Sequence, residues 1–255
     1  MSTKLTIHPV KDWRPVNPQS RSLLAASAHY RKSDLPLFAA GYNELCRIDL
    51  SGRRVLEICC GRGELSAAIA RAWPQAEVFA LDRYPDAGGA VRAARETAGL
   101  HNAHYLCGDA LHLAELDPAS FDVVVGQAAL HHLAHDTTAV GREFSRVLKP
   151  DGRLIFINEP LGHNVLVAMV RAFQVSRARI GDESNLFVGL IEEVAMDFAG
   201  CEVKAFNLLG YPLKLVHRLA PASSVALVHR LDTVLMNQWP RLAQFGGNAN
   251  IIFRR

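Results

Sequence analysis

The stretch Val55-Leu56-Glu57-Ile58-Cys59-Cys60-Gly61-Arg62-Gly63 decides the fold, because an apolar run ends in a glycine loop that opens a helix. Residues 55–58 predict a short buried strand, and residues 65–73 have a helical period that ends before a proline. At Gly61 and Gly63 the backbone can approach a ligand closely, where a Cβ would obstruct it. A strand, a ligand-binding loop and a helix are therefore expected in succession.

Strands and helices continue to alternate after this stretch. Strands are expected at 78–81, 104–107, 121–126 and 153–158, and helices at 88–98 and 138–148. The segment Lys149-Pro150-Asp151-Gly152 has the composition of a turn before the fifth strand. Five βα units at this spacing imply an α/β fold with a doubly wound, Rossmann-like parallel sheet.

The alternation loosens after residue 158. Helical patterns are expected at 165–177, 187–198 and 212–237, a sixth strand at 201–208 and a final strand at 250–254. Ligands in open α/β sheets bind outside the carboxyl ends of the strands, so segments inserted there can cover that crevice.

We expect one domain over 1–255. Its parts are a helical arm or lid at 1–50, a cofactor-binding core at 51–160, and helical cap insertions at 161–200 and 209–247 around an acceptor pocket. Within the arm, residues 1–20 are expected to be loose, and helices are expected at 21–30 and 35–47.

The composition indicates a globular protein. Hydrophobic residues make up 49% and charged residues 21% of the 255 residues, which excludes a disordered or fibrous chain. The 28 basic and 25 acidic residues give a net charge of +3 and no charge footprint for nucleic acid or an anionic membrane. We expect a small-molecule partner, no nucleic acid, no stable membrane association, and a monomer or homodimer.

The cysteines indicate the compartment. Five cysteines without a paired C-x-x-C framework predict reduced thiols and a cytoplasmic location. Residues 1–20 lack the apolar core of a secretory signal, and no apolar stretch reaches membrane-spanning length.

Two ligands are compatible with the glycine loop alone. Gly61 and Gly63 with Ser66, followed by Asp82 at the end of the second strand, resemble a dinucleotide fingerprint. Glu57 argues otherwise, because a carboxylate just before the loop would repel a pyrophosphate but favour a ligand carrying an ammonium and a sulfonium.

Three acidic residues follow three successive strands. Besides Glu57, Asp82 can accept hydrogen bonds from both hydroxyls of a ribose, and Asp109 can accept one from an adenine amino group. Each could instead cap the helix that follows its strand. Together with the glycines, the three acids favour a site for an adenosine-containing cation.

These residues resemble the class I S-adenosylmethionine-dependent methyltransferases, in particular a small-molecule group with an LHHL segment after the fourth strand. The resemblance covers about 50–160, and residues 250–254 resemble that family's antiparallel seventh strand. The motifs are 55–63 as quoted above, Ala80-Leu81-Asp82, Gly108-Asp109-Ala110, Leu130-His131-His132-Leu133, and Arg146-Val147-Leu148-Lys149-Pro150-Asp151-Gly152.

The resemblance implies S-adenosyl-L-methionine as the cofactor and a seven-stranded sheet. It implies Glu57, Gly61 and Gln127 near the methionine end, Asp82 on the ribose, and Asp109 with Ala110 at the adenine; Gly63 in the loop and Arg83 beside Asp82 complete the expected site. The chain departs from the family at Cys59, where the loop usually has its first glycine, and we expect this side chain to lie beside the cofactor as part of its site.

Methyl transfer from a sulfonium is an in-line displacement, so the protein must align the acceptor and, for a hydroxyl, remove its proton. His131 and His132 follow the fourth strand, and histidine titrates in the useful range. We expect one of the two to face the pocket and favour His132. The other is expected to pack against the fold or cap the next helix.

Three further residues are candidates for the acceptor side of the site. Glu159 and His163 lie in an EPLGHN segment that resembles related natural-product enzymes, so both are candidates for orienting the acceptor or the base; a plain turn is the alternative. Tyr30 belongs to helices that close over the cofactor in similar enzymes, or to the core. No cluster has convincing metal-ligand spacing, so no metal is expected.

The expected function is methylation of an oxygen or nitrogen of a small molecule, with a product of secondary metabolism as the expected acceptor. An enzyme that closes the cofactor's aminobutyrate chain on itself is the first alternative, and an NAD-dependent oxidoreductase is the second. A non-catalytic scaffold would have no need of the polar residues His131, His132 and Glu159.

Overall fold

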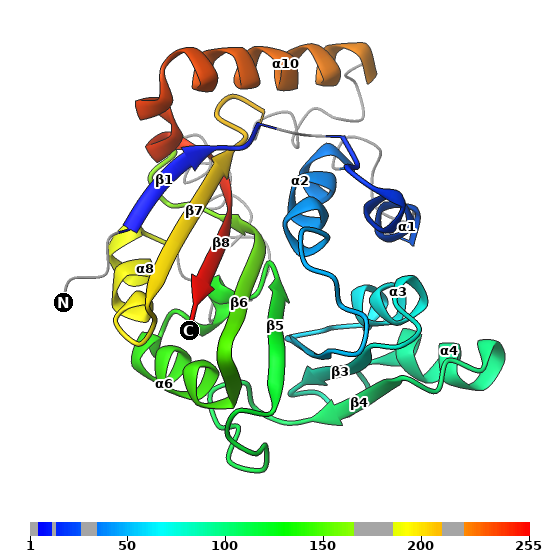
Figure 1. The fold of residues 1–255 in the computed structure, drawn as a ribbon. Coiled ribbons are helices and arrows are strands. Elements are labelled where there is room, and N and C mark those ends of the chain that lie inside the picture. The colour runs from blue at the N-terminus through cyan, green and yellow to red at the C-terminus, as the bar shows by residue number, and fades with distance from the viewer. Residues whose placement is uncertain (1–4, 12–13, 27–34, 166–185, 211–221) are drawn as a thin grey trace.

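The computed structural model describes residues 5–11, 14–26, 35–165, 186–210 and 222–255. They form an eight-stranded sheet in the order β1-β7-β8-β6-β5-β2-β3-β4 (Figure 1). The strands are β1 (Leu5–Pro9), β2 (Arg54–Ile58), β3 (Glu77–Asp82), β4 (Ala103–Cys107), β5 (Phe121–Gln127), β6 (Leu148–Pro160), β7 (Gly200–Phe206) and β8 (Asn248–Arg254). Every neighbouring pair is parallel except those of β8, which runs antiparallel to β6 and β7. The expected doubly wound sheet with an antiparallel last strand is confirmed.

Helices cover both faces of the sheet. They are α1 (Pro18–Ala26), α2 (Leu35–Leu45), α3 (Glu64–Ala72), α4 (Gly89–Ala98), α5 (Leu130–Leu133), α6 (Thr137–Val147), α8 (Val188–Ala195) and α10 (Ala222–Gln238), with a 3₁₀ helix, η1 (Pro240–Phe245). Alternate residues of β2 serve the two faces: Val55 packs with α1 to α4, and Leu56 packs with α6 and α8. Figure 1 shows the two helical layers on either side of the strands.

The loose arm expected over residues 1–20 is wrong in two places. Residues Leu5–Pro9 form β1, which pairs parallel with β7 at the edge of the sheet and makes eight strands instead of seven. Leu5 and Ile7 pack against the hydrophobic core. Five residues with two apolar positions are too short a pattern to recognise, so the strand depends on the neighbour that it meets. Helix α1 also begins earlier than expected, at Pro18.

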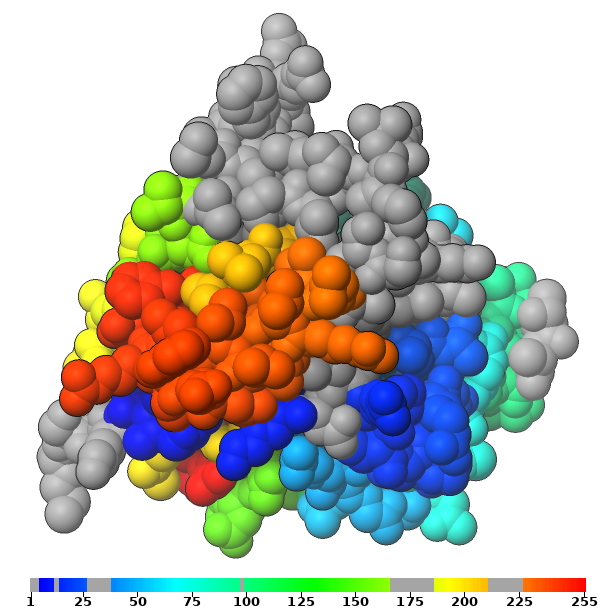
Figure 2. All heavy atoms as spheres, turned by 90° about the horizontal axis from the view of Figure 1, so that it is seen from above, coloured from blue at the N-terminus to red at the C-terminus, as the bar shows by residue number. Residues whose placement is uncertain are grey.

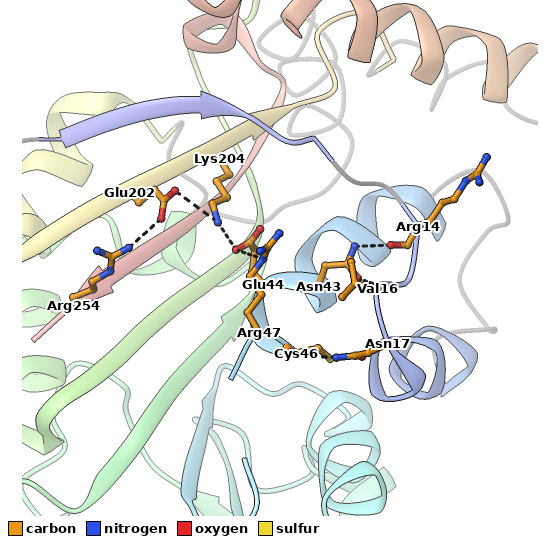
Figure 3. Close-up of polar contacts among 10 residues, drawn as sticks. All are labelled: Arg14, Val16, Asn17, Asn43, Glu44, Cys46, Arg47, Glu202, Lys204 and Arg254. Atoms are coloured by element: carbon orange, nitrogen blue, oxygen red, sulfur yellow. Dashed lines mark hydrogen bonds and ion pairs between the residues drawn. The ribbon is translucent and has the colours of Figure 1, made fainter. Parts of the chain in front are cut away.

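Polar contacts tie α1 and α2 to the rest of the fold (Figure 3). Lys204 of β7 donates to Glu44 of α2, and both side chains are largely buried. Asn43 of α2 donates to the Arg14 carbonyl at 2.8 Å, and Asn17 donates to the Cys46 carbonyl at 3.1 Å. Lys204 therefore ties α2 to the sheet, and the Asn43 and Asn17 contacts tie the segment before α1 to α2 and to the residue that follows it.

Two local predictions differ from the structure in detail. The histidine segment expected as a loop forms the short helix α5. The turn at Lys149-Pro150-Asp151-Gly152 lies inside β6 as a bulge, because Phe121 pairs with Leu148 but Val123 pairs with Arg153. The expected helix at 165–177, the first part of that at 212–237 and the end of that at 21–30 lie outside the described residues.

Candidate functional site

The glycine loop turns sharply between β2 and α3. Cys59, Gly61 and Gly63 all have positive φ, at 51°, 52° and 76°. A Cβ at Gly63 would lie 2.7 Å from a methyl carbon of Val91, whereas a Cβ at Gly61 would meet no described atom within 4 Å. Gly63 is therefore required for packing, and Gly61 keeps open the space in front of the loop.

Asp82 holds this loop from the neighbouring strand. The Gly61 N–H donates to Asp82 Oδ2 at 2.8 Å, and the Gly63 N–H donates to the Cys60 carbonyl at 2.8 Å. The other oxygen of Asp82 accepts from the Tyr84 N–H at 3.2 Å. The amides of both glycines are thus already used within the protein.

The side chain of Glu57, a residue of β2, lies against the first turn of α3. It is buried, and Oε2 accepts from the Ser66 N–H at 2.8 Å and from the Ser66 hydroxyl. Burial raises the pKa of Glu57 to about 7, and the nearby carboxylates of Asp82 and Glu64 act in the same direction. The site therefore holds a carboxyl group whose ionisation a cation would favour.

Two cavities meet at the loop, and both are bordered by Cys59 and Gly61. The smaller has a volume of about 190 Å³ and includes Glu57, Gln127 and Tyr42 in its lining. The larger has a volume of about 640 Å³. Besides Cys59 and Gly61, its lining includes five further expected site residues, Asp82, Arg83, Asp109, Ala110 and His132.

Cys59 lies where the two cavities join. Its backbone adopts the left-handed conformation that glycine takes without cost, so the cysteine is held there by the surrounding structure. Burial, together with the carboxylates of Asp82 and Glu159, raises the pKa of its thiol to about 12. The thiol is therefore neutral at physiological pH and presents sulfur, without charge, to both cavities.

Asp109 lines the larger cavity and is half exposed. One oxygen accepts from the Leu111 N–H at 2.9 Å, and the other lies 3.6 Å from Nδ1 of His112. The exposed part of the carboxylate can accept another hydrogen bond. Beside it, the buried Ala110 provides an apolar contact in the same lining.

The two histidines of α5 have different environments. His132 borders the larger cavity, whereas His131 is buried, and their ring centroids lie 4.0 Å apart. His131 Nδ1 donates to Glu159 Oε2 at 2.9 Å. Only His132 of the pair has direct access to the cavity.

Glu159 is fully buried and caps α5. Its oxygens accept from the backbone N–H groups of Ala129 at 2.6 Å and Leu130 at 2.9 Å, and from both backbone and ring of His131. It borders neither of these two cavities and reaches them only through His131 and its neighbour His132. The alternative of an exposed turn carboxylate is wrong, because Glu159 has no exposed surface.

The remaining expected acceptor residues lie elsewhere. His163 accepts from the Val188 N–H at 2.9 Å and packs its ring edge on Phe187, so it caps the start of α8 and borders neither cavity. Tyr30 lies outside the described residues. Among the described residues, no group of three or more His, Cys, Asp or Glu is placed to hold a metal ion.

Tyr42 is a site residue that the sequence pattern did not single out. Its hydroxyl donates to Gln127 Oε1 at 3.2 Å across the smaller cavity. Tyr42 belongs to α2, 85 positions from Gln127 along the chain, and it is otherwise buried with Phe38. An aromatic residue in an apolar helix gives no sign of such a contact.

Residues 55–152 match the family model described as a methyltransferase domain. A ubiquinone biosynthesis O-methyltransferase of Neisseria meningitidis is 37% identical over 111 residues, which cover 42% of this chain and 44% of that relative. A phthiotriol/phenolphthiotriol dimycocerosates methyltransferase of Mycobacterium leprae is 33% identical over 110 residues, which cover 43% of this chain and 39% of that relative. The matched region spans less than half of either relative.

Among solved structures, phosphoethanolamine N-methyltransferase 2 of Haemonchus contortus, in complex with S-adenosyl-L-methionine, has the same fold. The TM-score is 0.58 at 20% identity, over 92% of this chain and 56% of that one. None of the described helices is long and apolar enough to cross a membrane. Residues 55–152 thus match a methyltransferase domain, and the chain shares the fold of a methyltransferase that binds S-adenosyl-L-methionine.

Proposed function

We propose that this protein transfers a methyl group from S-adenosyl-L-methionine to an oxygen or nitrogen of a small molecule. The observation that supports this most directly is the pair of cavities that meet at Cys59 and Gly61, with one carboxylate set at each of three strand ends. Bound there, the cofactor would supply an electrophilic methyl group on its sulfonium.

The residues around the loop fit such a cofactor. Glu57, Gln127 and Tyr42 would hold the charged amino-acid end in the smaller cavity. Asp82 would accept from the ribose hydroxyls, and Asp109 with Ala110 would hold the adenine in the larger cavity. The carboxylates of Glu57, Asp82 and Asp109 are hydrogen-bond acceptors, which suit the ammonium, hydroxyl and amino donors of the cofactor.

The same contacts argue against a nicotinamide dinucleotide. A pyrophosphate site needs free backbone N–H groups at a helix amino terminus. Here the Gly61 and Gly63 amides have internal partners, and Ser66 gives both of its donors to Glu57. A phosphate would meet carboxylates where it needs donors.

His132 is our candidate for the base. Its exposure to the larger cavity allows a neutral imidazole to accept a proton from an acceptor hydroxyl during transfer. His131 would act as a positioning residue, because Glu159 anchors its ring and the ring contacts His132. Proton removal matters for a hydroxyl acceptor and less for an amine that is already neutral.

The names of the two relatives suggest a class of acceptor. One is named for ubiquinone biosynthesis and the other for phthiotriol/phenolphthiotriol dimycocerosates. We propose a hydroxyl-bearing acceptor with a substantial apolar part, in a cytoplasmic enzyme of secondary or cofactor metabolism.

Calorimetric titration with S-adenosylmethionine, its demethylated product and NAD tests the cofactor. We expect S-adenosylmethionine and its demethylated product to bind and NAD not to bind. A protein that binds neither S-adenosylmethionine nor its demethylated product would refute the proposal. Incubation with the cofactor alone tests for self-cyclisation, because methylthioadenosine formed without any acceptor would support that alternative instead.

Variants of the histidines test the base. With a phenol and an amine panel and radiolabelled methyl donor, His132→Gln should lower the turnover of hydroxyl acceptors by about 10²- to 10⁴-fold while product binding stays unchanged. His101→Gln is a matched control, because His101 is exposed and does not border either cavity. Equal turnover in the two variants would remove His132 from the mechanism.

A further inference from the structure

Helix α10 carries an apolar stripe on the side that faces away from the protein. Leu227, Leu231 and Val234 are 57%, 46% and 58% exposed. Their spacing of four and then three residues places them in one row along the helix. Asp232 and Met236, on the opposite side, are buried. The exposed face of an ordinary surface helix is polar, so this stripe is the reverse of the usual pattern.

The stripe is continued and flanked by residues typical of a membrane boundary. Trp239 and Phe245, at and after the end of α10, are 54% and 46% exposed. Arg230 on α10 and Arg241 in η1 are exposed cations. Figure 2 shows α10, in orange, lying open across the end of the molecule that faces the viewer. We call Leu227, Arg230, Leu231, Val234, Trp239 and Arg241 the α10 surface.

The charge of this part of the chain is one-sided. Residues 203–255 contain seven basic residues and one acidic residue, Asp232, which leaves 21 basic and 24 acidic residues in the first 202. Asp232 is buried and accepts from the Leu209 and Gly210 N–H groups. The net charge of +3 for the whole chain is therefore the sum of a cationic carboxyl-terminal region and a slightly anionic remainder.

The elements that pack against α10 do not reverse this charge. Among the described elements, those that contact α10 most extensively are η1, β1 and β7, and their one acidic residue is Glu202, which is paired with Lys204 and Arg254. The α10 surface thus combines an apolar stripe with cations and contributes no exposed acid of its own.

We propose that the α10 surface docks reversibly on an anionic lipid surface. Leu227, Leu231 and Val234 enter the boundary between headgroups and acyl chains, and Arg230 lies against lipid phosphates. A second copy of the chain fits less well, because a two-fold contact along α10 would bring like cations together. The charge of the whole chain predicts no stable membrane association, but it averages over residues 1–202 and 203–255. The contact proposed here is reversible and involves only the α10 surface.

Sedimentation with lipid vesicles tests the proposal on the full chain. Vesicles of phosphatidylcholine with about one quarter phosphatidylglycerol should bind the protein, and binding should weaken as salt is raised because the arginine contribution is screened. Leu231→Glu should lower the vesicle affinity about tenfold or more, since it places a charge in the apolar stripe. Met196→Glu is the matched control, because Met196 is 75% exposed on another part of the molecule.

Both substitutions are at exposed positions, so equal melting temperatures and equal binding of the demethylated cofactor should accompany the loss of lipid affinity. Those two measurements also separate this proposal from the proposed methyl transfer. Absence of vesicle binding, or an equal loss for Met196→Glu, would overturn the proposal. A concentration-dependent dimer that Leu231→Glu abolishes, without vesicle binding by the wild type, would assign the surface to a second copy instead.

Discussion

Asp82 Oδ2 accepts a hydrogen bond from the Gly61 N–H at 2.8 Å. In a dinucleotide-binding loop this N–H would be available to a pyrophosphate, but here a carboxylate from β3 already uses it. Asp82 lies 21 positions from Gly61 along the chain and reaches it because β2 and β3 are parallel neighbours. The contact both shapes the loop and sets its charge preference. A loop closed in this way suits a cationic ligand with donor groups.

The ionisation of Glu57 should make stability depend on pH. Its pKa rises from 4.5 to about 7 on folding, so the folded state holds the proton more tightly. The corresponding stability is fully present below pH 4.5 and is lost as the pH rises through about 7, by an amount on the order of 3 kcal/mol. Urea unfolding across this range should show the slope, and Glu57→Gln should remove it.

The same group predicts the pH dependence of cofactor binding. A cation near Glu57 stabilises the ionised carboxylate, so affinity for S-adenosylmethionine should increase as the pH rises through about 7. Calorimetry at several pH values measures this. A flat profile in the wild type would show that the cation binds away from Glu57.

Gly63 should be intolerant of a side chain. Gly63→Ala places a Cβ 2.7 Å from Val91 at a φ of 76°, while Gly52→Ala has a similar φ of 71° and no described atom within 4 Å. Both variants carry the backbone strain, so their difference isolates the clash. We expect Gly63→Ala to lose about 1 to 3 kcal/mol more in the free energy of unfolding. Equal losses would mean that Val91 moves aside freely.

Cys59 should show the cost of its left-handed backbone. Cys59→Gly and Cys59→Ala both remove the thiol, but only glycine adopts a φ of 51° without strain. Cys59→Gly should therefore be more stable than Cys59→Ala by about 1 kcal/mol in thermal or urea unfolding. The reverse order would place the strain elsewhere in the loop.

Glu159 should be required for stability independently of any catalytic role. Glu159→Ala leaves the amides of Ala129 and Leu130 and the ring of His131 without their acceptor in a buried setting. A loss of about 3 to 5 kcal/mol in the free energy of unfolding is expected. Glu77→Ala, which breaks the exposed pair with Arg54, should cost less than about 1 kcal/mol. A small loss at Glu159 would contradict its assignment as the cap of α5.

Much of the core was predictable because it depends on local patterns. The apolar runs at β2, β3, β5 and β6 are long enough to identify buried strands, and each is followed by a turn or a helical period. Parallel strands end at one edge of a sheet, so Glu57, Asp82 and Asp109 could be placed together before their contacts were known. These residues are arranged by the regularity of the fold.

Other features depend on contacts between segments distant in sequence. The strand β1 has too little apolar pattern of its own and forms through pairing with β7. Tyr42 reaches Gln127 across 85 positions, and Glu159 reaches α5 across 28 to 30. No local period contains that information.

The sequence by itself determined the parallel sheet, the glycine loop and the three acids around it, because periodicity and strand order act over short stretches. Only the tertiary structure decided that His132 borders the cavity while His131 is buried on Glu159, and that the apolar stripe of α10 faces outward. The physical reason is that side-chain burial depends on which distant segment packs on each face, and neighbouring residues on a helix point in different directions.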